Sequence, residues 1–254
     1  SQGGMGYMLQ QSLGNVMREA GLPANVCAMV TQVEVDAADP AFQHPTKPVG
    51  RFFSADEARQ MAQQTGWTFA EDSGRGWRRV VPSPAPLRIL EIDAVRVLLQ
   101  AGILPVVSGG GGIPVVRAAD GSYHGAPAVI DKDLTSAMLA SELGAQKLLL
   151  LTGVDQVALD FGRPTQRLLD RLTLEQAREH YLAGQFPPGS MGPKVQAAMQ
   201  FLQSAQHGVA GGGMAASGKA GSGGNSAGRE VVITSLDRAV EAMDGKAGTR
   251  MVAS

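Results

Sequence analysis

The sequence predicts an α/β fold in which a mostly parallel sheet lies between layers of helices. Apolar, strand-like runs alternate with helical patterns along most of the 254 residues, and short turns join them. Four consecutive leucines in residues 147–152 are typical of a strand covered on both faces. A run of glycines at 109–112 directly follows the apolar run 103–107. Ligands bind at such strand ends in open α/β sheets.

The segment 126–155 carries the clearest strand–helix–strand pattern. Its apolar run 127–130 predicts the end of a strand, Asp131 predicts a helix N-cap, and Gly144 predicts the end of that helix. Lys132 is unusual, because a cation in the first turn opposes the helix dipole by roughly 0.3–1 kcal/mol. Two interpretations explain it: a solvated Asp-Lys-Asp turn, or a lysine placed beside a phosphate.

A second helix also opens with a lysine. Residues 189–195 predict a helix start, with Pro193 at the first position and Lys194 in the first turn. Lys132 and Lys194 together predict two cations that converge on one anion. The glycines at 109–112 would let backbone N–H groups approach a ligand as well.

Residues 37–86 differ in character from the rest of the chain. They hold several prolines, both tryptophans and many charges. Residues 54–57 form a capping box that opens a short helix, and the turn 72–76 joins strand candidates at 66–71 and 77–81. We interpret residues 37–86 as a small protruding lid. It is inserted in a single main domain that spans residues 1–254.

The remaining elements follow from periodicity and caps. An amphipathic helix over 5–20 carries an apolar face that suits either the core or a dimer contact. Residues 208–228 are rich in Gly, Ala and Ser and predict a flexible insertion. The other predicted elements are helices over 91–101, 173–184, 193–208 and 235–243, strands over 26–35, 103–107, 231–234 and 248–252 (the last at an edge), a strand pair over 157–169, and a polar turn region over 115–125.

Composition excludes several classes of function. The net charge is −1 and aromatic residues make up 5%, which argues against binding to nucleic acid. No apolar run approaches the length of a membrane span. The single cysteine, Cys27, lies in an apolar run, predicts a core position and is compatible with a reducing cytoplasm. No histidine has a metal-ligand partner at a useful spacing, so the sequence predicts no metal site made by the protein alone.

Seven motifs in this order resemble the carbamate kinases of the amino-acid kinase superfamily. They are SQGGMGYMLQQ, TQVEVDAADPAFQHPTKPVG, EDSGRGWRRVVPSPAP, SGGGGIPV, AVIDKDLTSAMLA, LLLTGVDQVALDFGRPTQ and GSMGPKVQAA. The resemblance implies a three-layer αβα sandwich with a protruding subdomain. It also implies a cytoplasmic homodimer of arginine metabolism that transfers phosphate between ATP and carbamate with Mg²⁺. The reaction often runs from ADP and carbamoyl phosphate toward ATP.

The same resemblance implies roles for individual residues. Lys132 and Lys194 would stabilise the transferring phosphoryl group, and Asp133 would orient Lys132 or help organise the metal site. Lys47 would reach from the lid to the carbamoyl or phosphate end. The alternative for Asp133 is a favourable acid in a first helical turn, and for Lys47 a solvated turn lysine.

Two groups of ligand-binding residues complete this set. Gly109, Gly110, Gly111 and Gly112 would bind carbamate or phosphate through backbone N–H groups. The nucleotide would lie against Thr152, Gly153, Val154, Asp155, Val157, Phe161, Met191, Gly192, Pro193 and Lys194. For Val157 and Phe161, plain core packing is an equal alternative.

The sequence departs from the family at its start. Carbamate kinases begin with a strand and a glycine–asparagine phosphate loop, and a His-Gly-Asn-Gly turn follows. Neither motif occurs before the one that opens this sequence. We therefore expect a fragment, a misplaced gene start or a degenerate copy. A non-catalytic nucleotide-binding relative is the alternative function, and an enzyme for another small acid is a third.

Overall fold

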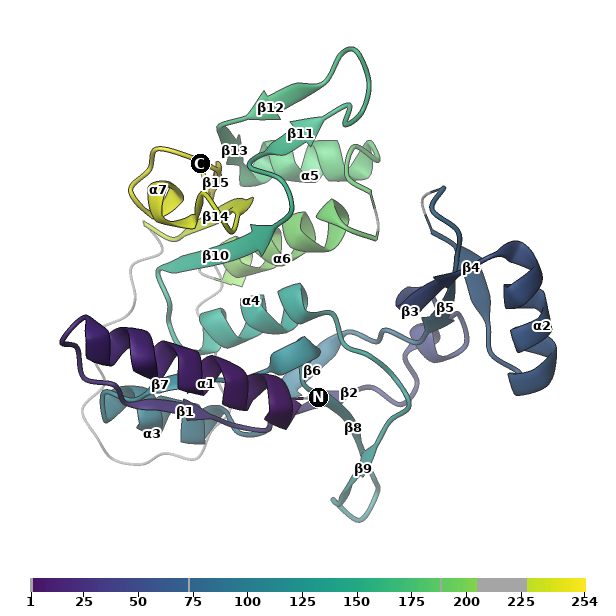
Figure 1. The fold of residues 1–254 in the computed structure, drawn as a ribbon, viewed down its shortest axis with the longest axis horizontal. Helices are drawn as coiled ribbons and strands as arrows, with labels where there is room; N and C mark the ends of the chain where they lie inside the picture. Colours follow the sequence, from purple (N-terminus) through teal and green to yellow (C-terminus); the bar gives the residue numbers. More distant parts are fainter. Residues whose placement is uncertain (1, 73, 188, 205–227) are drawn as a thin grey trace. The chain divides into compact units, whose positions relative to one another are not determined.

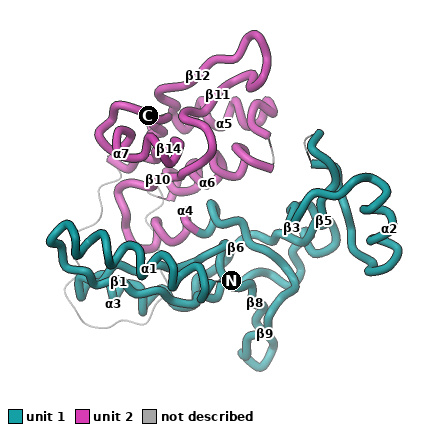
Figure 2. Tube along the Cα trace, viewed as in Figure 1, with its two compact units in different colours: residues 1–135 teal, residues 136–254 magenta. Residues whose placement is uncertain are grey.

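The computed structural model describes residues 2–72, 74–187, 189–204 and 228–254. They form two compact units, residues 1–135 and 136–254, which are described separately below (Figure 2). Each unit combines helices with sheets that contain parallel strand pairs. The predicted α/β class is therefore confirmed. The predicted insertion at 208–228 lies, except for its last residue, outside the described residues.

In the first unit, two short parallel strands lie between two helices (Figure 1). Strand β1 (Val26–Ala28) pairs with β7 (Leu104–Val106), and α1 (Gln2–Glu19) and α3 (Ile92–Gln100) pack against them. The single strand predicted over 26–35 is wrong, because the chain leaves this ladder after Ala28 and joins a different sheet at Gln32. Between them, the Thr31 N–H donates to Oε1 of Gln2 at 2.9 Å.

A four-stranded sheet continues the first unit. Its order is β6 (Pro86–Ile89), β2 (Gln32–Val35), β8 (Ile113–Arg117) and β9 (Tyr123–Gly125), with β2 and β8 parallel. The polar turn region predicted over 115–125 is wrong, since β8 and β9 form a hairpin there. Only its tip is a turn, where Asp120 accepts from the Ser122 N–H and Gly121 has φ +89°.

The segment predicted as a lid has a sheet and a helix of its own. Strand β5 (Trp77–Val81) lies between β3 (Lys47–Phe53) and β4 (Phe69–Glu71), and α2 (Ala55–Thr65) packs on β3 and β5. The short 3₁₀ turn η1 (Pro40–Phe42) precedes them. The capping box of Ser54 and Glu57 and the hairpin between β4 and β5 are both confirmed. The function of this segment as a lid stays a prediction.

The second unit is built on a four-stranded sheet. Its order is β10 (Lys147–Thr152), β14 (Glu230–Ser235), β15 (Thr249–Val252) and β13 (Arg171–Thr173). The pair β10–β14 is parallel, as is β13–β15, whereas β14–β15 is antiparallel. Strand β15 was predicted at an edge, but it lies inside the sheet. Its alternate residues Thr249 and Met251 are fully buried, which explains that place.

Helices cover the sheet of the second unit. Helix α6 (Met191–Ser204) packs on β10 and β14 and also contacts α5 (Leu174–Leu182), which starts at the predicted capping box. Phe201, Leu202 and Val195 of α6 are buried. Strands β11 (Val157–Leu159) and β12 (Arg167–Leu169) form the predicted pair.

Two predicted helix starts in this unit are wrong. Helix α6 begins at Met191, so Pro193 is its third residue, still within the first turn where its missing N–H costs no hydrogen bond. Helix α7 (Ala239–Met243) begins beyond Ser235, which instead ends β14 and is buried. Among the described residues, no helix is long and apolar enough to cross a membrane.

Candidate active site

The start of helix α4 (Lys132–Glu142) is the centre of the candidate site in the first unit. Asp131 caps the helix as predicted, because its Oδ1 accepts from the Asp133 N–H at 2.9 Å. Asp133 is buried, whereas Lys132 is exposed at the first helical position. The predicted strand end at 127–130 is wrong. These residues form a loop in which the Val129 N–H donates to the Pro82 carbonyl at 3.0 Å.

An ion pair joins the predicted lid to this helix start. Nζ of Lys47, the first residue of β3, donates to Oδ2 of Asp131. Burial by itself would raise the pKa of Asp131. The hydrogen bond and charge of Lys47, together with backbone N–H groups of Asp133 and Leu134, outweigh that effect and hold the pKa below its ordinary value. Asp131 is therefore a buried carboxylate that stays charged because a cation is present.

The glycine loop is fixed against the same helix start. It forms the 3₁₀ turn η2 (Gly109–Gly111) after β7. A Cβ at Gly111 would lie 2.2 Å from the Ile130 carbonyl oxygen, and one at Gly112 would lie 2.3 Å from Cγ2 of Val33. The Thr135 hydroxyl donates to the Gly111 carbonyl at 2.9 Å. Two of the four glycines are therefore required for packing, while Gly109 and Gly110 are exposed.

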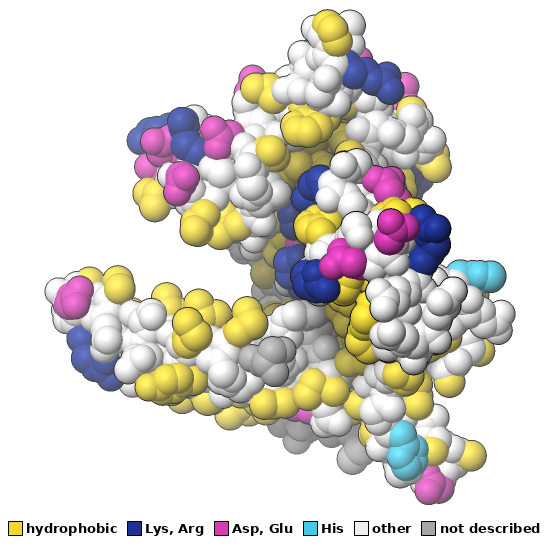
Figure 3. Space-filling model, turned by 45° about the vertical axis from the view of Figure 1, so that its right-hand side comes forward, with side chains coloured by type: hydrophobic (Ala, Val, Ile, Leu, Met, Phe, Trp, Pro, Cys, Tyr) yellow, Lys and Arg dark blue, Asp and Glu magenta, His cyan; other side chains and the backbone are white. Residues whose placement is uncertain are grey.

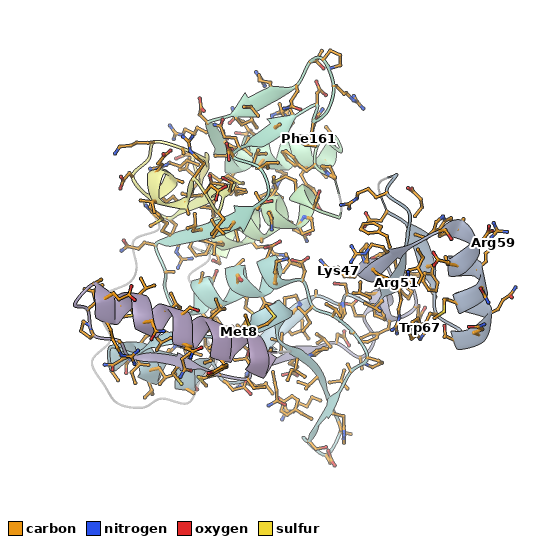
Figure 4. The ribbon with its side chains drawn as sticks, in the orientation of Figure 1. Met8, Lys47, Arg51, Arg59, Trp67 and Phe161 are labelled. Carbon is orange, nitrogen blue, oxygen red and sulfur yellow. The ribbon has the colours of Figure 1, made fainter. Side chains whose placement is uncertain are left out.

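Lys47, the glycine loop and the start of α4 are thus brought together within the first unit. Figure 4 shows Lys47 on the lid, where β3 begins. Sequence reasoning assigned Asp131 only a capping role and overlooked its ion pair. Nothing in the sequence spacing shows that residues 84 positions apart are paired.

Ser108 is a second residue that sequence reasoning missed. It is buried, and its φ of 56° is rare for a residue with a side chain. Its N–H donates to Oγ1 of Thr31 at 2.8 Å, whereas its hydroxyl has no hydrogen-bond partner within the described part of the chain. The serine directly precedes the glycine run, and that position is the one sequence signal for it.

The predicted nucleotide residues of the second unit lie where two parallel strands end. Thr152, the last residue of β10, is opposite Ser235, the last residue of β14. Gly153, Val154 and Asp155 follow Thr152 in the turn beyond the strand. The buried hydroxyl groups of Thr234 and Ser235 have no hydrogen-bond partner among the residues described. Ligands bind at such carboxyl ends of parallel strands.

Helix α6 contributes the other part of this predicted set. Gly192 and Lys194 are buried in its first turn, while Met191 and Pro193 are partly exposed. A Cβ at Gly192 would lie 2.9 Å from the Pro187 carbonyl oxygen, so this position requires glycine. Val157 and Phe161 differ, because Val157 is fully buried and Phe161 is 59% exposed (Figure 4). Core packing therefore explains Val157, and the nucleotide contacts of both stay predictions.

A cavity of about 480 Å³ lies beside Asp155 in the second unit. Its walls also carry Asp170 and four cations, and three of these cations, Arg238, Lys246 and Arg250, are already paired with carboxylates. Lys132 and Lys194 lie in different units, and their convergence on one anion stays a prediction. In the described ranges, no three His, Cys, Asp or Glu side chains form a cluster that could hold a metal ion.

Comparisons with known proteins identify the family of the chain. The amino acid kinase family model matches residues 8–210. The carbamate kinase of Staphylococcus haemolyticus is 43% identical over 249 residues, which is 98% of this chain and 74% of that protein. The carbamate kinase of Pyrococcus furiosus is 42% identical over 252 residues, covering 99% of this chain and 73% of the other.

Solved structures give the same result. The carbamate kinase from Giardia lamblia bound to AMP-PNP has a TM-score of 0.79 and 40% identity, covering 99% of this chain and 72% of that one. The same enzyme bound to citric acid has a TM-score of 0.84 with equal identity and coverage. The chain therefore belongs to the carbamate kinases, a branch of the amino acid kinase family.

Proposed function

We propose that the chain is a carbamate kinase that transfers a phosphoryl group reversibly between ATP and carbamate. The direction that forms ATP uses ADP and carbamoyl phosphate. The observation that carries the proposal is the cluster in the first unit, where Lys47, the glycine loop and the start of α4 meet. Cations and backbone N–H groups are what phosphoryl transfer requires, since the chemistry depends on positioning and charge stabilisation.

The acceptor would bind at this cluster. The exposed backbone of Gly109 and Gly110 would donate N–H groups to the carboxyl or phosphate oxygens of the ligand. Lys132, exposed at the first position of α4, would stabilise the negative charge of the transferring group, and Lys47 would add a second cation. Asp133 would orient Lys132. This assignment explains why a lysine occupies a position that is unfavourable for helix stability.

The nucleotide would bind to the second unit. Its phosphates would face the first turn of α6, from Met191 to Lys194, and the turn from Thr152 to Asp155 would border the rest of the molecule. Lys194 would then act on the same phosphoryl group as Lys132.

Mg²⁺ would enter with the nucleotide. Magnesium commonly keeps several waters and binds through one or two carboxylates plus substrate phosphates. The carboxylate of Asp133 beside Lys132 suits such a shared site better than an all-protein cage. When bound, the ion would neutralise charge on the phosphates.

By likeness to the family we also propose a cytoplasmic homodimer that acts in arginine metabolism. The exposed apolar face of α1 supports a subunit contact (Figure 3). Its side chains Met5, Tyr7, Met8 and Val16 are each more than half exposed in the single chain. Contiguous apolar surface of this kind is typical of protein–protein contacts.

Similarity to carbamate kinases runs through both units rather than through the nucleotide half alone. This favours the enzyme over a non-catalytic nucleotide-binding relative. The test is ATP formation from ADP, Mg²⁺ and carbamoyl phosphate, with Lys132→Ala as the control. We expect activity in the wild-type chain and a loss in the control. Binding of ADP without any turnover in the wild-type chain would contradict the proposal and favour the nucleotide-binding alternative.

A further inference from the structure

The ion pair between Lys47 and Asp131 lies where the lid meets the rest of the first unit. Lys47 opens β3 and pairs across the sheet with Val81, the last residue of β5. The carbonyl of the next residue, Pro82, accepts from the Val129 N–H at 3.0 Å. Both ends of this part of the lid are therefore attached to the loop that leads into α4.

Asp131 uses its two oxygen atoms for two different tasks. Oδ1 accepts from the Asp133 N–H and caps the helix, whereas Oδ2 accepts from Lys47. The side chain of Asp131 is 8% exposed and that of Lys47 is 27% exposed. The carboxylate is thus held in one orientation by the helix, and the more accessible lysine is held by the carboxylate.

This pair lies directly beside the glycine loop. Asp131 follows Ile130, whose carbonyl oxygen closes against Gly111, and Asp131 precedes Lys132 in the chain. When Lys47 is bound to Asp131, it is therefore held close to the glycine loop and to Lys132, the first residue of α4. A free lysine side chain would sample many rotamers, and ordering it at the moment of reaction carries an entropy cost.

We infer that Asp131 is a positioning residue that holds the lid lysine Lys47 at the acceptor end of the site. The inference rests on the proposed function, because the group that Lys47 would meet there is the carbamoyl or phosphate end of the substrate. Asp131 would act through Lys47, because its two oxygens are occupied by the Asp133 N–H and by Lys47. Its contribution is to order a cation before the substrate arrives, which lowers the cost of the productive geometry.

The two tasks of Asp131 can be separated by substitution. Asn caps helices as well as Asp does, so Asp131→Asn keeps the cap and removes the charge that pairs with Lys47. Asp131→Ala removes both. Lys47→Met keeps the apolar stem of the lysine and removes its charge. Arg51→Met is the matched control, because Arg51 lies on the same strand and pairs with Glu57 on the exposed surface of the lid (Figure 4).

The experiment measures kcat/KM for carbamoyl phosphate, KM for ADP and the thermal midpoint of each variant. For Asp131→Asn we expect a roughly 100-fold loss of kcat/KM for carbamoyl phosphate, the size expected for a misplaced catalytic group. The KM for ADP should stay near wild type, the thermal midpoint should fall by only about 2–4 °C as the pair is lost, and Arg51→Met should match wild type. The double variant Lys47→Met/Asp131→Asn should lose no more than Lys47→Met alone.

Two results would overturn the inference. Losses that multiply in the double variant would mean that Asp131 acts independently of Lys47. A lower thermal midpoint for Asp131→Asn with unchanged kcat/KM would mean that the pair is purely structural. In either case the wild-type chain still forms ATP, so the proposed function would stand.

If the wild-type chain is inactive, the inference can still be tested by a measurement that does not require turnover. The rate at which an amine-acetylating reagent modifies Lys47, followed by mass spectrometry, reports whether the ammonium group is held. We expect a rise of about tenfold in Asp131→Asn, since a loss of about 1.4 kcal/mol of pairing free energy corresponds to that factor. An unchanged rate would show that Asp131 does not hold Lys47, whatever the reaction of the protein is.

Discussion

The two units hold their candidate site residues in different ways. In the first unit, specific contacts between side chain and backbone fix the site: the Lys47–Asp131 pair, the Asp131 cap and the close approach of Gly111 to Ile130. In the second, most candidate residues lie at the end of β10 or in the first turn of α6. The first arrangement depends on single atoms, whereas the second depends mainly on where strands and helices end. Substitutions in the first unit should therefore act through one contact at a time, whereas substitutions at the buried positions of the second unit should disturb packing and activity together.

The largest effect is expected at the glycine loop. Gly111→Ala would place a Cβ 2.2 Å from a backbone oxygen at φ +101°, a strain that the loop can relieve only by separating from α4. We expect destabilisation by more than roughly 3 kcal/mol, measured by urea unfolding. Gly110→Ala is the matched control, because its Cβ would meet open space and only the φ of +69° would cost about 1 kcal/mol. Equal losses at the two positions would contradict the comparison.

The next effect separates activity from stability at Lys132. Lys132→Ala should lower kcat by about 10²–10³-fold, the loss typical of one removed charge-stabilising group. The same variant should unfold no more easily than wild type, because an exposed lysine at the first helical position opposes the dipole. Lys194→Ala should lose activity and stability together, since Lys194 is buried in the first turn of α6. Stability losses of equal size in both variants would remove the distinction between the units.

The sequence revealed most of the repeating elements of both units. Capping boxes predicted α2 and α5, and the apolar run 147–152 predicted β10 with its observed bounds. These signals are local, since a cap or a covered strand is specified by neighbours in the chain. Errors arose where distant residues decide the outcome. Pairing with β7 and then with β8 divides residues 26–35 between two sheets, and pairing with β14 and β13 places β15 inside its sheet.

The candidate site was predicted to a similar extent. The structure brings Lys47 together with the glycine loop and with the helix start that holds Lys132 and Asp133. The family motifs had indicated a role for Lys47 at this site. The capping role of Asp131 was readable from its position, but its ion pair was not, because 84 residues separate it from Lys47. The strained Ser108 was missed because no local pattern signals a left-handed residue that carries a side chain.

A smaller effect should appear in acid. In the folded chain, the pKa of Asp131 lies below 3.8, which is the ordinary value for an aspartate. A depressed carboxyl pKa contributes stability that is present above the unfolded value and is lost as the pH falls through the folded value. The difference in unfolding free energy between wild type and Asp131→Asn should therefore be constant near neutral pH and shrink below about pH 4. A difference that is independent of pH down to acid would show that charge plays no part in holding the loop.

The smallest effect on folding is expected on the exposed apolar face of α1. Met8 is 66% exposed, so Met8→Glu should change the unfolding free energy of the single chain by less than about 0.5 kcal/mol. The proposed subunit contact, in contrast, would gain a buried charge and dissociate. Sedimentation velocity measures this directly, with Arg59→Glu on the surface of the lid as the control, because that side chain is exposed away from α1 (Figure 4). A wild-type dimer that persists in Met8→Glu would place the subunit contact elsewhere, and the apolar face of α1 would then need a different explanation.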